Sequence, residues 1–316
     1  MHEKPLYNAH DQQPAFALRH TWSGWASKGD LRALPESSWT DLVALWGKDG
    51  LRLLERAVQP DSALLTFSTT PAVSPVFLAA RAKGRLQHAF RTGASEPVDF
   101  SRKVAVRCVG ENTSESVLAY IHSQVRNEEF IDPRFAEFLE QFTVINSQVD
   151  LSQPAPTNSG RYWYNLHLVL VTDSRCRVID EATLTLIRDG SFRVAEKKGH
   201  QIAALSVMPD HLHVALRANP EHSPEEVALA FQNNLAFMLG KGAIWRPGYY
   251  VGTFGEYNMN AIRRALRLES ASPAGQAGRG LSRSDNFVSP LILFTCRTSR
   301  QGSPRWGSFF RQRNTN

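Results

Sequence analysis

The stretch Met208-Pro-Asp-His-Leu-His-Val-Ala-Leu216 decides how this chain of 316 residues folds, because its frame occurs twice. Both copies lie in alternating apolar runs, a pattern typical of strands. The frame repeats 149 positions earlier, where Pro60-Asp61, Pro71 and Ser74-Pro75 stand in place of Pro209-Asp210, Pro220 and Ser223-Pro224. The sequence therefore predicts an internal duplication. The two copies differ in the slots of His211 and His213, which hold Ser62 and Leu64 in the first copy.

The duplication extends on both sides of this frame. An apolar approach precedes each copy, and a Ser-Pro helix start follows it. Each half then continues with a strand that ends in glycine and with a last helix. The expected pairs are strands 15–22 and 163–171, helices 75–90 and 224–239, strands 104–110 and 249–255, and helices 114–127 and 259–269. This order predicts an α+β fold, with an antiparallel sheet and helices packed on one face in each half.

Composition excludes several classes of protein. The chain is 42% hydrophobic and 21% charged, and it has no run of 18 apolar residues, so we expect neither a membrane span nor a membrane partner. Residues 1–13 are polar rather than a signal sequence. Three widely spaced cysteines predict neither a disulfide framework nor a cysteine-based zinc site. Together these features favour a reducing, cytoplasmic location.

Four segments follow from the repeat and from composition. Residues 1–128 form the first half and residues 161–269 the second. Residues 129–160 between them predict a helix over 133–144 and a polar linker over 146–160. The segment 270–316 contains seven arginines and one acid, which accounts for the net charge of +6. Such a Gly-, Ser- and Pro-rich basic tail is expected to be flexible, and either contacts phosphate or aids solubility.

Residues at positions i and i+2 of a strand point to the same face, so His211 and His213 present two imidazoles side by side. Two neutral imidazoles on a rigid strand can hold a divalent cation when a third ligand approaches from elsewhere. The pair taken alone is weak evidence, because two histidines also occur on the wet face of a sheet. His167 and His222 have no such spacing and are left unassigned.

Met208-Pro-Asp-His-Leu-His213 closely resembles the signature of the single-tyrosine HUH transposases, which include insertion-sequence and REP-associated tyrosine transposases. The segment Trp245-Arg-Pro-Gly-Tyr-Tyr-Val-Gly-Thr-Phe-Gly255 resembles a second family segment. In that family a helix follows, with the nucleophilic tyrosine and often, four residues later, a glutamine that helps to hold the metal. The matching positions here are Ala265 and Glu269, so the second half lacks the nucleophile.

The first half supplies what the second half lacks. Counted from Gly110 as from Gly255, the equivalent positions are Tyr120 and Gln124, which a helix places on one face. The family forms dimers in which the tyrosine helix of one subunit serves the histidine pair of the other. The chain thus resembles such a dimer fused head to tail: two tandem ferredoxin/RRM-like HUH domains in an intramolecular pseudo-dimer. Without the repeat, Tyr120 would be interpreted as an interface residue and Gln124 as a solvated one.

The resemblance implies one composite active site and one lost site. Tyr120 would be the nucleophile that forms a 5′-phosphotyrosine, and His211, His213 and Gln124 would hold Mg²⁺ or Mn²⁺. The lost site would comprise Ser62, Leu64, Ala265 and Glu269. No nucleotide cofactor is expected, because the phosphotyrosine ester stores the energy for rejoining. The chain would act as a monomeric pseudo-dimer or as a dimer of such chains.

The substrate implied is single-stranded DNA, often with a hairpin beside the cleavage site. Candidate DNA contacts are basic residues of both halves and one tryptophan that could stack on a base: Arg81, Lys83, Arg85, Lys197, Lys198, Arg263, Arg264, Arg267 and Trp245. Two other functions stay open at this stage. One is a domesticated hairpin-binding protein without catalysis, and the other is a nickase that acts at a replication origin or a telomere-like end.

Overall fold

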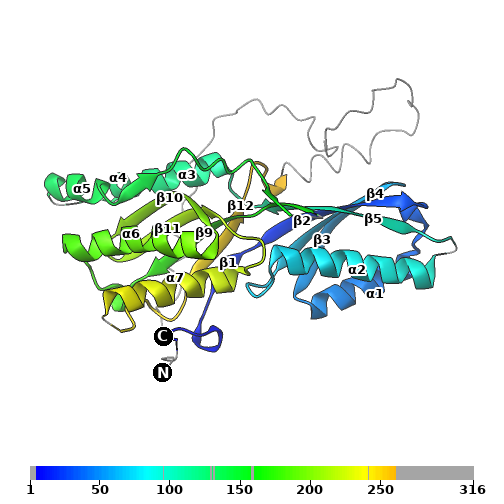
Figure 1. The fold of residues 1–316 in the computed structure, drawn as a ribbon, viewed down its shortest axis with the longest axis horizontal. Coiled ribbons are helices and arrows are strands. Elements are labelled where there is room, and N and C mark those ends of the chain that lie inside the picture. Colours follow the sequence, from blue (N-terminus) through cyan, green and yellow to red (C-terminus); the bar gives the residue numbers. More distant parts are fainter. Residues whose placement is uncertain are drawn as a thin grey trace, which may run out of the picture. The chain divides into compact units, whose positions relative to one another are not determined.

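Two six-stranded sheets, each with its own helices, make up the described part of the chain (Figure 1). The computed structural model describes residues 5–94, 96–128, 130, 132–157, 160–240 and 242–260. The α+β class expected from the duplicated order is confirmed, and both sheets are mixed rather than purely antiparallel.

The first sheet has the order β3-β4-β2-β5-β8-β7. Its strands are β2 (Arg19–Lys28), β3 (Leu51–Val58), β4 (Ser62–Thr69), β5 (Asp99–Val109), β7 (Ala155–Pro156) and β8 (Gly160–Trp163). Helices α1 (Glu36–Lys48) and α2 (Pro75–Gly93) pack on it around a core that includes Trp22, Trp46 and Phe67. Short 3-10 turns lie at Ala9–Asp11 and Leu31–Ala33.

The second sheet has the order β1-β12-β9-β11-β10-β6. Its strands are β1 (Ala15–Ala17), β6 (Thr143–Ile145), β9 (Asn165–Val171), β10 (Gln201–Met208), β11 (His211–Arg217) and β12 (Tyr250–Phe254). Helix α6 (Glu181–Lys198) connects β9 to β10, and α7 (Pro224–Leu239) connects β11 to β12. They thus take the same places in the chain order as α1 and α2 do in the first half. A 3-10 turn, Asp173–Arg175, follows β9. Ser223 caps α7 through a capping box with Glu226, and Pro224 occupies the first turn, as the Ser-Pro pattern predicts.

The two halves exchange strands reciprocally. The strand expected over 15–22 divides at Leu18: β1 pairs in parallel with β12 of the second sheet, and β2 enters the first sheet. The strand expected over 163–171 divides in the same way at Tyr164, with β8 parallel to β5 of the first sheet and β9 in the second. Leu18 and Tyr164 are each 1% exposed, so both crossing points are buried.

Two equivalent glycines lie where β5 and β12 meet. A Cβ at Gly110 would lie 2.4 Å from the carbonyl oxygen of Thr253, and a Cβ at Gly255 would lie 2.5 Å from that of Cys108. The Thr253 hydroxyl also donates to the carbonyl of Val109 at 2.8 Å. The absence of a side chain at both positions therefore lets the backbones of the two halves touch.

The second sheet carries helices on both faces, because helices from outside the second half add to its own. Helices α6 and α7 cover one face, and α3 (Ser114–His122), α4 (Gln124–Asn127) and α5 (Pro133–Glu140) lie on the other (Figure 1). Helix α3 comes from the first half but contacts β10 and β11 of the second. The sheet is thus enclosed by its own helices on one side and by borrowed ones on the other.

Three other expectations need correction. The helix expected over 114–127 breaks at Ser123 into α3 and α4. The helix expected over 133–144 ends at Glu140, and residues 143–145 form β6 beside β10. The expected linker 146–160 contains β7 and the first residue of β8. The helix expected over 259–269 lies almost entirely outside the described residues, and the tail 270–316 lies wholly outside them. Among the described residues, no helix has the length and apolar content needed to cross a bilayer.

Candidate active site

The histidine pair lies at the start of β11, on the sheet face that α3 covers. His211 and His213 point to the same side, with ring centroids 4.9 Å apart and an interplanar angle of 88°. Leu212 and Val214, the alternate residues, are fully buried in the main core. The period-two alternation of the strand therefore separates the core face from the histidine face, as the sequence predicted.

His211 is held by a chain of two ionic hydrogen bonds. Its Nδ1 lies 2.6 Å from Oδ1 of Asp210, and Nη1 of Arg175 donates to Oδ2 of the same carboxylate at 2.9 Å. The hydrogen bond with His211, followed by the weaker influence of Arg175, lowers the pKa of Asp210 to about 2. Asp210 is therefore ionised at neutral pH and orients the His211 ring so that Nε2 remains available.

His213 is held by a third histidine that the sequence left unassigned. Its Nδ1 lies 3.0 Å from Nε2 of His167, and the two rings stack with centroids 5.3 Å apart. His167 is on β9 opposite Ala215, while His213 is opposite Val169, so the two histidines are diagonal neighbours on adjacent strands. Alternation alone shows that His167 and Val169 share a face. The register of β9 against β11, which makes His167 a neighbour of His213, was not readable from the sequence.

Burial keeps both of these imidazoles neutral. Desolvation lowers the pKa of His167 to about 4, and it lowers the pKa of His213 well below the usual range. His211 and His167 lower the pKa of His213 further through charge repulsion. Neutral imidazole is the form that binds a metal, so the environment favours the ligand state.

Tyr120 reaches this pair from the first half of the chain. Its ring lies edge-on to His213, with centroids 5.5 Å apart at 87°, and 6.2 Å from the ring of His167. Thr113 starts α3 by accepting a hydrogen bond from the Ser116 amide. Val117 and Ile121 of α3 then pack against a small-residue patch of the sheet that contains Ala203, Ala204 and Ala215. These short side chains let the helix lie close enough for its tyrosine to meet the histidines.

Gln124 lies one turn beyond Tyr120, on the far side of the break at Ser123. Its side chain is buried, and Nε2 donates to the Tyr120 carbonyl at 3.1 Å. Burial raises the pKa of the Tyr120 phenol, and a side-chain hydrogen bond with Gln124 partly offsets this. The phenol is thus protonated at neutral pH and needs activation before it can act as a nucleophile.

The side chains around Tyr120 supply only some of the ligands that a divalent metal ion needs. In the described part of the chain, no group of three His, Cys, Asp or Glu side chains is placed to hold a metal ion. His211 and His213 offer two nitrogens, because Asp210 and His167 occupy their Nδ1 atoms. A third ligand would have to be an oxygen of Gln124, of substrate or of water. Such an open set is typical of a catalytic rather than a structural metal site.

The equivalent place in the first half has neither histidine. Leu64 lies opposite Ser23 of β2, in the position that His213 takes opposite Val169 of β9. The Ser62 hydroxyl donates to its neighbour Asp61 at 3.1 Å. Ala265 and Glu269, the remaining residues of the expected lost site, lie outside the described residues.

The candidate DNA contacts have varied surroundings. Arg85 forms an ion pair with Asp49, and Arg81 lies 3.9 Å from the same carboxylate. Lys83 donates to the Ser101 carbonyl, whereas Lys197 is exposed and Lys198 half-buried at the end of α6. Trp245 is 2% exposed and lies in the same main core as Leu212 and Val214, which corrects the expectation that it stacks on a base. Arg263, Arg264 and Arg267 lie outside the described residues.

Comparison with known proteins gives the second half a class. Residues 161–266 match the family model "Transposase IS200 like". Residues 161–266 are an IS200-like transposase domain. A relative, the ISDra2 transposase TnpA of Deinococcus radiodurans, is 25% identical over 130 residues, which cover 37% of this chain and 93% of that protein. The domain at residues 161–266 is thus of the IS200 transposase type, a type of HUH tyrosine nuclease.

Two solved structures are also similar to part of this chain. A transposase from Deinococcus radiodurans is 26% identical, with a TM-score of 0.28, over 33% of this chain and 89% of that one. A REP-associated tyrosine transposase bound to a REP hairpin is 14% identical, with a TM-score of 0.27, over 33% of this chain and 62% of that one. The assignment rests on the sequence matches of the second half.

Proposed function

We propose that this transposase cuts and rejoins single-stranded DNA at one composite site, with Tyr120 from the first half and the His211–His213 pair from the second. One observation carries the proposal: the Tyr120 ring lies 5.5 Å from the His213 ring, although the two residues belong to different halves. Helix α3 packs on β10 and β11 of the other half, so the approach of this tyrosine is built into the fold.

The chemistry assigned to Tyr120 is an in-line attack on a backbone phosphate. Its phenolic oxygen bonds to phosphorus and loses its proton, while the bond from phosphorus to the 3′ oxygen breaks and that oxygen gains a proton. The products are a 5′-phosphotyrosine and a free 3′-hydroxyl. Attack by an incoming 3′-hydroxyl reverses the step, so no nucleotide is consumed. His211, His213 and an oxygen of Gln124 would hold Mg²⁺ or Mn²⁺, which polarises a phosphate oxygen when bound.

The residues around Tyr120 have defined tasks in this scheme. Asp210 and His167 fix the orientation of the two ligand rings. Gln124 hydrogen-bonds the turn that carries Tyr120 and so restricts its position. Because burial raises the pKa of the phenol, cleavage in the absence of a cation is expected to be slow at neutral pH.

The test uses the purified full chain and labelled single strands from both sides of its own gene, with and without their hairpins. After incubation with Mg²⁺ or Mn²⁺, denaturing electrophoresis and peptide mapping locate any covalent adduct. We expect an adduct on Tyr120 that disappears with EDTA, with Tyr120→Phe and with His211→Ala.

Tyr250 provides a matched control within the same neighbourhood. Its ring lies 5.8 Å from that of His167, so it is a second phenol close to the histidines. Tyr250→Phe should keep the adduct. An adduct that maps to Tyr250, or tight hairpin binding without an adduct on any strand, would overturn the composite site. The second of these results would instead favour a domesticated DNA-binding protein.

A further inference from the structure

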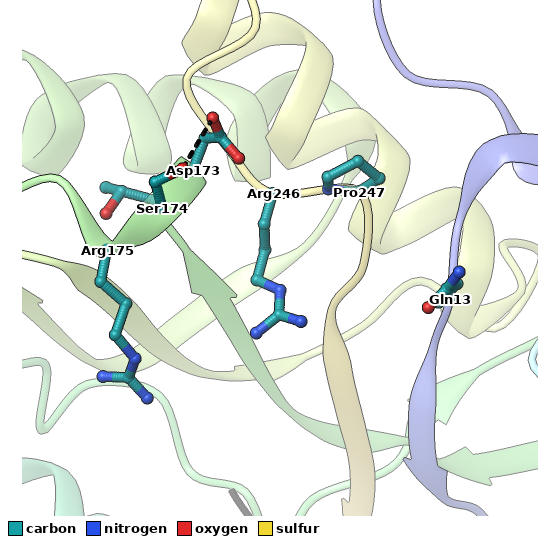
Figure 2. A pocket seen from close by; sticks show the side chains of 7 residues that line it. Gln13, Asp173, Ser174, Arg175, Arg246 and Pro247 are labelled. Atoms are coloured by element: carbon teal, nitrogen blue, oxygen red, sulfur yellow. Dashed lines mark hydrogen bonds between the residues drawn. The ribbon is translucent and has the colours of Figure 1, made fainter. Parts of the chain in front are cut away.

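A cavity of about 400 Å³ lies beside the turn that follows β9 (Figure 2), and the Thr172 amide of this turn donates to Asp210, the residue before β11. Three segments line it: the turn after β9, the loop before β12 and the N-terminal arm at Gln13. None of its lining residues is aromatic, and two of them are arginines, Arg175 and Arg246. The walls therefore suit a charged backbone group better than a base, which would need a stacking partner.

The two guanidinium groups extend to the same side of the cavity, and the carboxylate of Asp173 is directed away from them (Figure 2). Asp173 accepts a hydrogen bond from the Ser174 hydroxyl. Arg246 is exposed and forms no ion pair or side-chain hydrogen bond with the part of the chain that the structure describes. Arg175 uses one nitrogen on Asp210, which leaves most of its five N–H donors available. The open side of the cavity is therefore cationic.

The cavity is tied to the histidine strand by short contacts. The amide of Thr172 donates to the Asp210 carbonyl at 2.9 Å, and the same Asp210 joins Arg175 to His211 through its side chain. Ser174 and Arg175 have φ values of 52° and 50°, which non-glycine residues rarely adopt. The turn thus carries a strained backbone that presents Arg175 to the cavity.

We propose that this cavity binds a backbone phosphate of the DNA strand, next to the phosphate that Tyr120 attacks, through Arg175 and Arg246. The inference rests on the proposed function, since it assumes that a single strand passes the histidine pair. Paired guanidinium groups are well suited to phosphate oxygens because their planar fork offers parallel N–H donors. A phosphate held there fixes the register of the strand while carrying no sequence information.

Arg246 offers a cleaner test than Arg175, because changing Arg175 would also disturb Asp210 and His211. Binding of a fluorescein-labelled single strand from the flanking DNA is followed by anisotropy in EDTA, so that no cleavage is needed. Loss of one phosphate contact should reduce the slope of log K against log salt by about 0.7, or about fivefold in affinity at 0.1 M salt. Arg193→Ala removes one exposed charge from α6, on the opposite sheet face, and should bind like the wild type.

A methylphosphonate scan then identifies the phosphate. Neutral linkages are introduced one at a time, and the wild type should lose affinity most strongly at one position beside the cleavage site. Arg246→Ala should bind this modified strand no more weakly than the unmodified one. An unchanged scan profile for Arg246→Ala overturns the proposal. Competition by inorganic phosphate that depends on Arg246, with an unchanged scan, would indicate a free-anion site and overturn it as well. Since the readout needs no adduct, failure of the Tyr120 chemistry can be told apart from failure of this site.

Discussion

Replacing Gly110 by alanine should destabilise the junction between the two halves, because the added Cβ would collide with backbone atoms. The added Cβ would lie 2.4 Å from the Thr253 carbonyl oxygen and 3.0 Å from both the Asn112 oxygen and the Phe254 Cα. All three neighbours are backbone atoms, so none can move aside by rotating a side chain. The strands β5 and β12 must separate locally by about 1 Å to reach ordinary van der Waals contact.

Overpacking a filled interior should lower the free energy of unfolding by about 1–3 kcal/mol. For a folded unit of this size, that corresponds to a fall in melting temperature of roughly 2–12 °C. Helix α3 starts at Ser114, and the Ser114 amide donates to the Gly255 carbonyl at 2.8 Å. A shift at Gly110 should therefore also move Tyr120 and lower the yield of adduct.

Gly84→Ala is the control, and it should change stability in the opposite direction. Gly84 is within α2, and a Cβ there meets nothing within 4 Å. Alanine at this position should raise stability by about 0.5–1 kcal/mol, because glycine loses more backbone freedom on folding. Both variants are compared with the wild type by thermal and urea unfolding. If Gly110→Ala melts at or above the wild-type temperature, the close backbone approach at the junction does not exist.

Two further changes test the buried histidines. Burial lowers the pKa of His20 to about 4, so the folded state resists its protonation. The contribution of His20 to stability is complete above pH 6.5 and should fall by about 1.4 kcal/mol per pH unit from pH 6.5 towards 4, in addition to the contributions of the other buried histidines. His20→Leu, which introduces the residue found at the equivalent Leu166, should make that slope shallower in urea unfolding at pH 7, 5.5 and 4.5; an identical slope would refute this origin. His167→Leu replaces the ring by a side chain of similar volume that cannot hydrogen-bond with Nδ1 of His213, so Mn²⁺ affinity measured by calorimetry should drop about 10–100-fold. Unchanged affinity would show that His167 does not orient the ligand.

The local elements were readable from the sequence where local signals suffice. The Ser-Pro starts at Ser74 and Ser223 located α2 and α7, because capping and proline geometry act within one turn. The face shared by His211 and His213 followed from strand alternation. Counting between the two copies indicated Tyr120 as the partner of this pair, and the structure places the rings 5.5 Å apart.

What the sequence could not supply depends on contacts between distant segments. The division of the opening strands at Leu18 and Tyr164 exchanges partners between the halves, and alternation continues across both residues without a local sign. The resemblance implied that the helix of Tyr120 meets the other half, but not the small-residue patch around Ala203 and Ala215 on which α3 packs. His167 was missed because strand register depends on the whole sheet. For Trp245 the sequence allowed either base stacking or a core role, and the distant Tyr7, whose hydroxyl accepts from the Trp245 amide at 2.7 Å, is part of the core that buries it.

The reciprocal exchange of β1 and β8 makes each half incomplete when taken by itself. A first half cut off before Gly160 would lack the strand that lies beside β5, and a second half without residues 15–17 would leave β12 exposed along one edge. Deletion of the first half would therefore uncover one edge of the sheet of the second. The first half thus completes the sheet of the second, although it has no counterpart of His211 and His213.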